Sequence, residues 1–331
     1  MKELNTSGRA LLMALADGQW HTGDELGEML GVSRAAVWKQ LKKLQAMQLE
    51  IFAVKGRGYR LSRPLELIDP QALRQRLQDE SATCFMQVHY SHSLDSTNLT
   101  AMNMVAEGKT HGQLVVAEHQ AAGRGRRGKS WHSPFGENIY LSLIWSFQGG
   151  LAGLEGLSLA IGLGLAKGLH RLGVEGVELK WPNDVLIDNK KVSGILIEVS
   201  GETEGECHVV IGIGLNVEMQ NATDDLITQP WCSLRPYLPA DVGRNALLQT
   251  VMVDLVGVLE QFVDVGFAGL RDEWLTYSAH MGQALRLSSG TMITEGVMVG
   301  LTDTGGLEVR TAKGVEVFYG GEVSVRAVSA S

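Results

Sequence analysis

The first 64 residues alternate apolar and polar positions with the period of short amphipathic helices. The pattern predicts a first helix over 7–16, which stops at an Asp-Gly pair, and a second helix that begins at Thr22. Glu25 follows Thr22 by three residues, which predicts a capping box. Ser33 is placed to cap a third helix over 34–47. Three short helices in this order indicate a helix-turn-helix.

The third helix has two unlike faces. Val37, Leu41 and Leu44 share one face, whereas the opposite face carries small and basic residues suited to a DNA major groove. Two strand-like runs, 51–54 and 59–61, then flank a basic, glycine-rich tip, as in the wing of a winged helix. The alternative is a winged helix that binds another protein. The residues that we expect to contact DNA are Thr22, Ser33, Arg34, Ala35, Lys39, Lys42, Lys43, Lys55 and Arg57.

Charge is distributed unevenly along the chain. Residues 1–64 hold 10 Lys and Arg against 6 Asp and Glu, a net charge of +4. Because the whole chain has a formal net charge of −8, the remainder carries −12. A basic head joined to an acidic body favours DNA binding by the head.

Strand-like and helix-like segments alternate from residue 65 onward. The predicted strands are 88–90, 115–118, 139–145, 177–180, 185–187, 194–199 and 208–213. A helix is expected over 99–107, and the small-residue-rich run 151–172 predicts one apolar helix packed on the sheet. Short strands and glycine turns follow Ser278. We therefore expect a mixed α/β (α+β) fold class with three domains, 1–64, 65–277 and 278–331.

Arginine and glycine alternate in Gly123–Gly128, directly after a predicted strand. Glycine lets the backbone approach a ligand closely, and each guanidinium offers a fork of donors to phosphate or carboxylate oxygens. The run therefore predicts an anion-binding loop. On this stretch alone, a solvated basic turn or an RNA-binding tract is the alternative. A Rossmann turn is excluded, because a turn-rich segment and the strand 139–145 follow where that motif needs a helix.

Five polar clusters interrupt the apolar pattern of the central segment. They are Asp95–Asn98, Gln120–Gly128, Lys180–Asp184, Lys191–Leu196 and Gly212–Asn216. Each alone is consistent with an ordinary turn. Together they supply uncharged hydrogen-bonding groups for a neutral polar head group, cations for a triphosphate, and an Asn-Asp pair able to hold Mg²⁺.

The remaining composition excludes several classes of protein. The three cysteines, Cys84, Cys207 and Cys232, are odd in number and far apart, so neither a disulfide framework nor a zinc site is expected. We find no signal peptide and no apolar run long enough to cross a bilayer. We expect a soluble, cytoplasmic protein with no membrane partner.

These motifs together resemble those of the bifunctional bacterial biotin protein ligases, also called biotin operon repressors. The sequences GRGRRG, KWPND and DNKKVSGIL occur at the spacing of that family, and the resemblance extends from the helix-turn-helix to Gly320–Arg326. It implies a class II synthetase-like central domain and a small SH3-like β-barrel after it. It also implies an enzyme that makes biotinyl-5′-AMP from biotin and ATP and then transfers biotin to a lysine.

The resemblance also implies roles for residues of the central domain. Those expected to bind biotin are Ser96, Thr97, Asn98, Gln120, Arg124, Gly125, Arg126, Lys191 and Gly194. Those expected on the ATP side are Arg127, Lys180, Asn183, Asp184, Asn216 and Trp231, the last in a loop over 221–231 placed to cover adenine. Lys191, Arg126 and Asp184 would be catalytic, and Asn183 and Asp184 would hold Mg²⁺. Whether Asp184 binds metal alone or also helps to deprotonate the acceptor lysine stays open.

Partners follow from the same resemblance. They are the biotin carboxyl carrier protein of acetyl-CoA carboxylase, operator DNA of the biotin operon, and a second copy of the chain, with biotinyl-5′-AMP as corepressor. Pairing through sheet edges would use the strand 192–198. Two rival functions are a transcription factor that only senses a small molecule, and a lipoate or octanoate ligase. The Ser-Thr-Asn cluster over 96–98 argues against the latter, because lipoyl groups lack a ureido ring.

Overall fold

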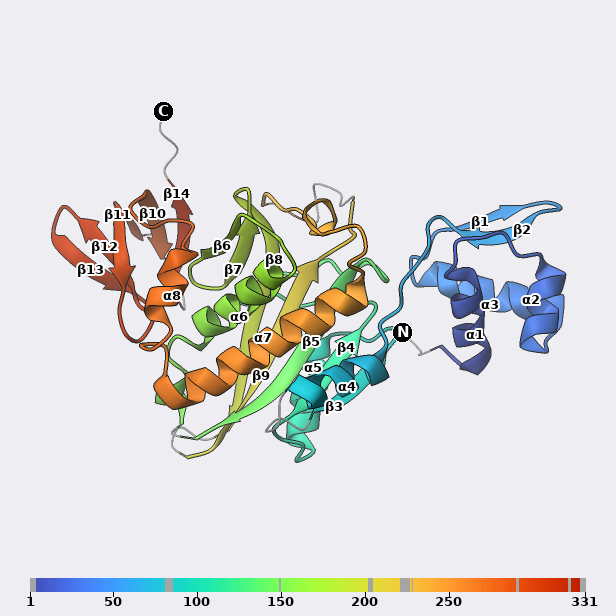
Figure 1. Cartoon of the computed structure of the whole chain (residues 1–331), viewed down its shortest axis with the longest axis horizontal. Coiled ribbons are helices and arrows are strands. Elements are labelled where there is room, and N and C mark those ends of the chain that lie inside the picture. Colours follow the sequence, from blue (N-terminus) through green and yellow to red (C-terminus); the bar gives the residue numbers. More distant parts are fainter. Residues whose placement is uncertain are drawn as a thin grey trace.

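The computed structural model of the chain describes residues 4–80, 86–148, 150–201, 205–220, 227, 229–289, 292–320 and 323–327. The described strands form three sheets, of two, seven and five strands in chain order. Figure 1 shows the small N-terminal head at one end, the seven-stranded sheet in the middle and the five-stranded sheet at the other end. Cys84, Gly321, and residues 221–226 and 228 of the expected adenine loop lie outside the described residues.

The N-terminal head is the predicted winged helix-turn-helix. Its elements are α1 (Thr6–Leu15), α2 (Gly23–Leu30), α3 (Arg34–Ala46), β1 (Ile51–Val54) and β2 (Gly58–Leu61). Thr22 and Glu25 form the capping box, and the Ser33 hydroxyl accepts a hydrogen bond from the third helix, so both predicted helix starts are confirmed. The apolar faces of the three helices bury one common core. Phe135, which comes from the central part of the chain, also packs in this core.

The central sheet has the strand order β3-β4-β5-β9-β8-β7-β6. Its strands are β3 (Gln87–Ser91), β4 (Gln113–Ala117), β5 (Asn138–Phe147), β6 (Val177–Lys180), β7 (Asp184–Ile187), β8 (Lys190–Gly201) and β9 (Cys207–Asn216). β3 and β4 run parallel, and every other neighbouring pair is antiparallel. The central strands read as continuous apolar runs because both faces of the sheet are covered. The predicted α/β class with a mixed sheet is confirmed.

Helices cover both faces of this sheet. On one face, α4 (Pro70–Glu80), α6 (Leu157–Arg171) and α7 (Arg244–Val265) share a large apolar core with the strands. On the other face, α5 (Thr97–Ala106) packs on β4, β5 and β9. Two described helical segments, 151–171 and α7, are long and apolar enough to span a membrane. Here α6 and α7 pack against each other and the sheet, with α7 lying diagonally across it in Figure 1.

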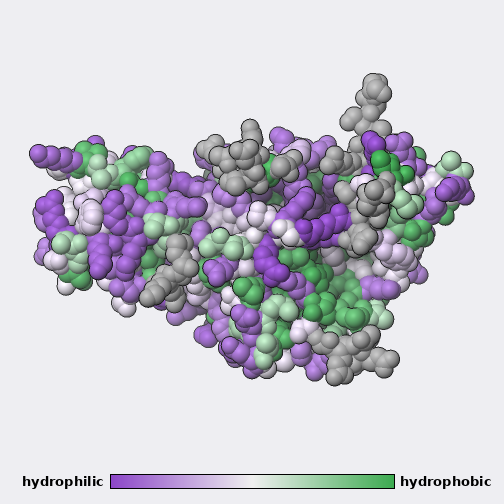
Figure 2. Space-filling view, turned by 180° about the vertical axis from the view of Figure 1, so that it is seen from behind, coloured by the Kyte–Doolittle hydropathy of each residue, from purple (hydrophilic) through white to green (hydrophobic). Residues whose placement is uncertain are grey.

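The face of the molecule seen from behind carries both polar and apolar surface. Figure 2 shows apolar surface gathered over the central region on this rear face, whereas the N-terminal head is mostly polar in this view. A polar surface on the head agrees with the exposed basic side chains of α3 and the wing. The head therefore presents charge to solvent, while the apolar side chains on the inner faces of its helices form a buried core.

The single helix predicted over 151–172 is wrong. A short 3₁₀ turn, η2 (Leu151–Leu154), comes first, and α6 begins only at Leu157. The break lies at Gly156, which has φ +77 and caps the helix in the left-handed conformation. A side chain at this position would also meet Phe267, whose Cβ lies 2.4 Å from an added Cβ. Conformation and tight packing at Gly156 therefore delay the start of the helix to Leu157.

The strand expected at the sheet edge, 192–198, is only partly at an edge. β7 pairs with β8 as far as Gly194, because the hairpin formed by β6 and β7 extends the sheet on that side. Beyond this hairpin, among the described strands, residues 197–201 of β8 pair only with β9. The available edge is therefore the later half of β8, and the earlier half is interior.

The C-terminal sheet contains five antiparallel strands in the order β13-β12-β11-β10-β14. These are β10 (Ala284–Ser289), β11 (Met292–Leu301), β12 (Leu307–Thr311), β13 (Gly314–Phe318) and β14 (Val323–Ala327), preceded by α8 (Arg271–Thr276). Leu285, Leu287 and Val309 from this sheet join the main core. Each sheet lies within one of the three predicted segments, and the domain limits themselves stay a prediction.

Candidate active site

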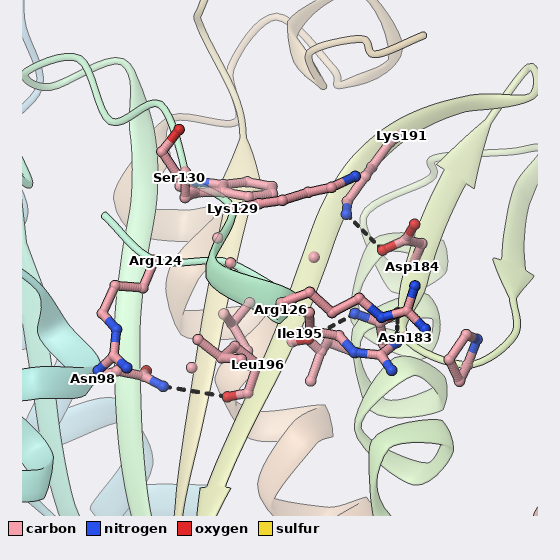
Figure 3. A pocket seen from close by; sticks show the side chains of 18 of the residues that line it. Asn98, Arg124, Arg126, Lys129, Ser130, Asn183, Asp184, Lys191, Ile195 and Leu196 are labelled. Atoms are coloured by element: carbon pink, nitrogen blue, oxygen red, sulfur yellow. Dashed lines mark hydrogen bonds and ion pairs between the residues drawn. The ribbon is translucent and has the colours of Figure 1, made fainter. Parts of the chain in front are cut away.

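A pocket opens between the glycine-arginine loop and the strands β8 and β9. Figure 3 shows Asn98 and Arg124 at one end, and Arg126, Asn183, Asp184 and Lys191 at the other. All nine residues expected to bind biotin line it: Ser96, Thr97, Asn98, Gln120, Arg124, Gly125, Arg126, Lys191 and Gly194. From the set expected on the ATP side, the lining residues are Arg127, Lys180, Asn183 and Asp184. The fold thus brings together segments that are far apart in sequence.

The loop is held in a compact shape. Arg124 and Ser130 form an isolated β-bridge, and Gly125 N–H donates to the Lys129 carbonyl at 2.7 Å. Between them lies η1 (Arg126–Gly128), in which Arg127 has φ 56. A non-glycine residue in the left-handed region is uncommon, so this backbone is constrained by its surroundings. The three arginine side chains therefore project from a short, ordered turn and not from an unstructured Arg/Gly segment.

One end of the pocket carries uncharged hydrogen-bonding groups. Ser96 caps α5, which begins at Thr97, two residues earlier than predicted. The Gln120 carbonyl accepts from the Thr97 N–H at 2.8 Å, and its amide donates to Ser133 at 3.0 Å. The polar side chains of 96–98 are nearly fully buried. Buried uncharged groups of this kind suit a neutral polar ligand, because such a ligand can form hydrogen bonds with them without burying an unpaired charge.

The other end is cationic. The Lys191 Nζ lies 2.6 Å from Asp184 Oδ1, and Arg126 donates to Asn183 Oδ1 at 2.7 Å. Arg126 also donates to the Gly320 carbonyl of the C-terminal segment. Burial lowers the pKa of the Arg126 guanidinium, and the neighbouring charge of Arg127 acts in the same direction. Two cations held close to the ligand space can neutralise a carboxylate and a phosphate brought there.

Trp131 is a pocket residue that the sequence reasoning missed. Gly194 and Gly214 pair directly across β8 and β9, and an added Cβ on Gly214 would lie 2.3 Å from the indole. Lys191 Nζ sits 5.4 Å from the centre of the indole ring, within cation–π range. The glycine pair therefore opens a slot for the tryptophan. Glycines at matching positions of two apolar strands were the available signal.

Glu198 was also missed. Its carboxylate accepts from the Asn98 amide at 2.8 Å and pairs with Arg124 at 3.0 Å. The sequence shows a glutamate in an apolar strand, which by itself reads as a solvent-facing position. Only the tertiary structure places it beside two residues of the pocket.

Only some of the residues expected to bind ATP line the pocket. Asn216 is buried and donates to the Cys232 carbonyl at 3.3 Å, and it does not line the pocket. Trp231 forms a bridge beside Lys191 and likewise does not line it. The described residues include no group of three His, Cys, Asp or Glu that could hold a metal ion.

The residues expected to bind DNA lie on the head. Ala35, Lys39, Lys42 and Lys43 are exposed on α3, as are Lys55 and Arg57 on the wing and Arg34 at the helix start. Thr22 and Ser33 serve as helix caps. Sequence reasoning missed Trp38, which is 56% exposed among the residues of this face. Lys42 Nζ lies 5.6 Å from its ring centre.

Comparison with known proteins agrees with this geometry. The sequence matches the Biotin/lipoate A/B protein ligase family over residues 90–216, an HTH domain over residues 3–60, and the Biotin protein ligase C terminal domain over residues 280–326. The solved structure of a biotin protein ligase from Aquifex aeolicus in complex with biotin and ATP is similar, with a TM-score of 0.63 and 26% identity. The match covers 73% of this chain and 99% of that one.

Curated relatives match over nearly the whole chain. The Bifunctional ligase/repressor BirA of Salmonella typhimurium is 36% identical over 316 residues, which cover 96% of each protein. The BirA of Escherichia coli is 35% identical over 322 residues, covering 97% of this chain and 98% of that one. At this identity and coverage, the chain belongs to the family of bifunctional biotin protein ligase/repressors.

Proposed function

We propose that this protein is an ATP-dependent biotin protein ligase that also represses transcription of the biotin biosynthetic operon. The observation that carries the ligase half is the two-ended pocket, with buried uncharged groups at one end and Lys191 and Arg126 at the other. Biotin has the matching form, with a neutral ureido ring at one end and a carboxylate at the other. Family membership over nearly the whole chain supports the same function.

The first step joins biotin to AMP. The biotin carboxylate is already ionised at pH 7, so this step needs no base but must bring two anions together. A carboxylate oxygen attacks the α-phosphorus while the bond to pyrophosphate breaks, and biotinyl-5′-AMP forms. Lys191, Arg126 and Lys180 offset the repulsion and stabilise the charge of the transition state. Closure of the loop over the mixed anhydride excludes water.

A magnesium ion would fit only as part of a complex with the nucleotide. Asn183 offers an amide oxygen and Asp184 a carboxylate. Proteins usually supply only one or two ligands to Mg²⁺ when substrate phosphates and waters supply the others. In this structure Arg126 and Lys191 contact those two side chains, so binding of the metal would rearrange the contacts. When bound, the ion would neutralise phosphate charge.

In the second step, the neutral amine of a carrier-protein lysine attacks the acyl carbon and AMP leaves. Asp184 is the one carboxylate among the described residues that line the pocket. Its charge is balanced by Lys191 at 2.6 Å. We propose Asp184 as the group nearest to the acceptor lysine, acting as a base or through the metal. The carrier is expected to be the biotin carboxyl carrier protein of acetyl-CoA carboxylase.

Biotin-dependent exchange of pyrophosphate into ATP tests the ligase function. We expect exchange with biotin and none with lipoate or octanoate, because these acids lack the ureido ring that the buried polar groups would bind. Exchange driven by lipoate would favour the rival ligase. A protein that binds biotin without exchange would favour a pure sensor of the small molecule.

The repressor half rests on the head. Its recognition helix and wing carry exposed basic residues that suit phosphate contacts, and Trp38 adds an apolar surface able to meet a thymine methyl group. A single small winged helix makes few phosphate contacts, so two copies on a twofold-symmetric operator would bind much more tightly. We propose that biotinyl-5′-AMP favours this pairing through residues 197–201 of β8, which pair only with β9 among the described strands. The protein is expected to act in the bacterial cytoplasm.

Affinity for operator DNA is expected to depend on the ligand. With biotinyl-5′-AMP, the protein should sediment as a dimer and shift operator DNA at a lower concentration than with biotin alone or without ligand, because pairing doubles the phosphate contacts. Mobility-shift titrations and sedimentation on the same samples measure both effects. Equal DNA affinity in all three conditions would remove the coupling and leave the ligase function untouched.

Arg126→Ala is expected to speed the release of biotinyl-5′-AMP by about 10- to 100-fold, since it removes charge-assisted hydrogen bonds of roughly 1.5–3 kcal/mol. Free biotin should bind with a smaller change, because Lys191 remains at this end for its carboxylate, whereas the adenylate also brings a phosphate there. Stopped-flow release measures the effect, and Arg271→Ala on the surface of α8 is the control. An unchanged release rate would move the clamping role to another residue.

A further inference from the structure

Glu198 lies at the junction of three elements beside the uncharged end of the pocket. It belongs to β8, and its Oε2 accepts from the Asn98 amide at 2.8 Å. Arg124 of the loop reaches the same carboxylate with both terminal nitrogens, at 3.0 Å to Oε1 and 3.4 Å to Oε2. One carboxylate therefore ties the loop to the strand and to the start of α5. Figure 3 shows Asn98 and Arg124 meeting at this end.

The carboxylate also fixes which way the Asn98 amide points. A carboxylate and a backbone carbonyl only accept, so the Asn98 nitrogen must face Glu198 and, at 3.4 Å, the Leu196 carbonyl. The Asn98 oxygen consequently faces the Ser142 hydroxyl. Gly212 leaves room for this arrangement, since an added Cβ would lie 2.0 Å from Asn98 Oδ1. A reversed amide would turn its oxygen toward Glu198 and Leu196, which only accept, and would lose both of these partners.

The Arg124–Glu198 pair also bears on loop closure. The loop carries three arginines within four residues, and their mutual repulsion opposes a compact shape. At the other end, Arg126 is held by Asn183 and the Gly320 carbonyl. Glu198 supplies the matching anchor at the uncharged end. The loop is thereby fastened across the pocket at both sides.

We propose that Glu198 is a positioning residue for biotin recognition: it orients the Asn98 amide and, through Arg124, holds the loop closed over the ligand. This inference rests on the proposed ligase function. The side chain of Glu198 acts through two neighbours and does not touch the reacting atoms. Its loss should therefore weaken retention of biotin and of the adenylate and spare the chemical step.

Glu198→Gln separates the two roles, because glutamine keeps an acceptor for Asn98 and loses the charge that holds Arg124. We expect the KM for biotin and the release rate of biotinyl-5′-AMP to rise about tenfold, a modest change because Arg124 is 47% exposed. The kcat of adenylate synthesis should stay within about twofold. Glu198→Ala removes the acceptor as well and should raise the KM further.

Glu295→Gln is the matched control, since Glu295 also lies on a strand and pairs with an arginine, Arg286, at 3.8 Å. It should leave the KM, the release rate and the melting temperature unchanged. Arg124→Gln should reproduce the Glu198→Gln effect, and the double variant should add little to either. Unchanged KM and release in Glu198→Gln, or a fall in kcat that follows a fall in melting temperature, would overturn the positioning role. Absence of biotin-dependent exchange in the unmodified protein would overturn the proposed function, and this role with it.

Discussion

Lys191→Ala is expected to lower the rate of biotinyl-5′-AMP synthesis at saturating biotin by about 100- to 1,000-fold, the range for removing one preorganised group that stabilises developing charge. Arg126 and Lys180 also line the pocket, but neither occupies the position of Lys191 beside Asp184, so neither replaces its charge there. Its loss also leaves the Asp184 carboxylate, now 2.6 Å from Nζ, without that ion pair and facing the incoming phosphates. Pyrophosphate exchange measures the effect.

Lys190→Ala is the control for this result. Lys190 is the preceding residue of β8 and is exposed, so its loss removes the same charge from the same strand outside the pocket. Exchange should stay within about twofold of the unmodified protein, as for other exposed surface positions. Thermal melting of both variants should show small changes, because a pocket cation contributes little to the core. Near-normal exchange in Lys191→Ala would refute its assignment as catalytic.

Much of the fold could be predicted because local rules agree with the tertiary structure. Thr22, Glu25 and Ser33 are capping residues whose effect depends on a few neighbouring backbone groups. The late start of α6 after Gly156 could not be predicted in this way. It depends on close packing against Phe267, which is far away in sequence. The interior position of the first half of β8 likewise depends on where the β6–β7 hairpin docks.

The residues of the candidate site differ in the same way: some could be predicted from the local sequence, and others depend on the tertiary structure. The polar clusters were visible because several functional groups stand together in short stretches of sequence, as in 96–98 and 123–128. Glu198 and Trp131 stand alone in sequence, and their roles come from partners in other elements. A single glutamate in a strand carries no local signal that distinguishes a positioning residue from a solvated one. Glu198 reaches Asn98 from β8, and the paired glycines of β8 and β9 leave room for Trp131, so both placements depend on the tertiary structure.

A second large effect concerns stability, at a buried ion pair between the residue after β4 and the first residue of α7. Glu118 is 0% exposed and Arg244 is 2% exposed, and their side chains lie 2.8 Å apart. Glu118 also accepts from the Ile68 N–H at 2.7 Å and the Tyr90 hydroxyl at 3.0 Å. Arg244 further donates to the Asn138 carbonyl at 2.8 Å. The pair therefore joins the segment after the head to β3, β5 and the start of α7.

Arg244→Met is expected to lower the free energy of unfolding by about 3–5 kcal/mol, because it leaves the Glu118 carboxylate buried without a compensating charge. The Glu118→Gln, Arg244→Met double variant should recover part of this loss, since it removes the charge that cannot be solvated. Calorimetry and denaturant titration of the three proteins measure the differences. The arginine backbone amide, which donates to Glu66, is kept in the variant, so the helix start is preserved.

Arg271→Met provides the comparison with an exposed pair. Arg271 contacts Asp272 and Asp303 at the surface of α8, where solvent screens the charges, so its replacement should cost no more than about 1 kcal/mol. The contrast isolates burial as the cause, because both changes remove an arginine and add a methionine. If Arg244→Met were no more destabilising than Arg271→Met, the Glu118 carboxylate would be solvated or bonded to another donor in the variant. The ion pair would then not be what joins the segment after the head to the central sheet.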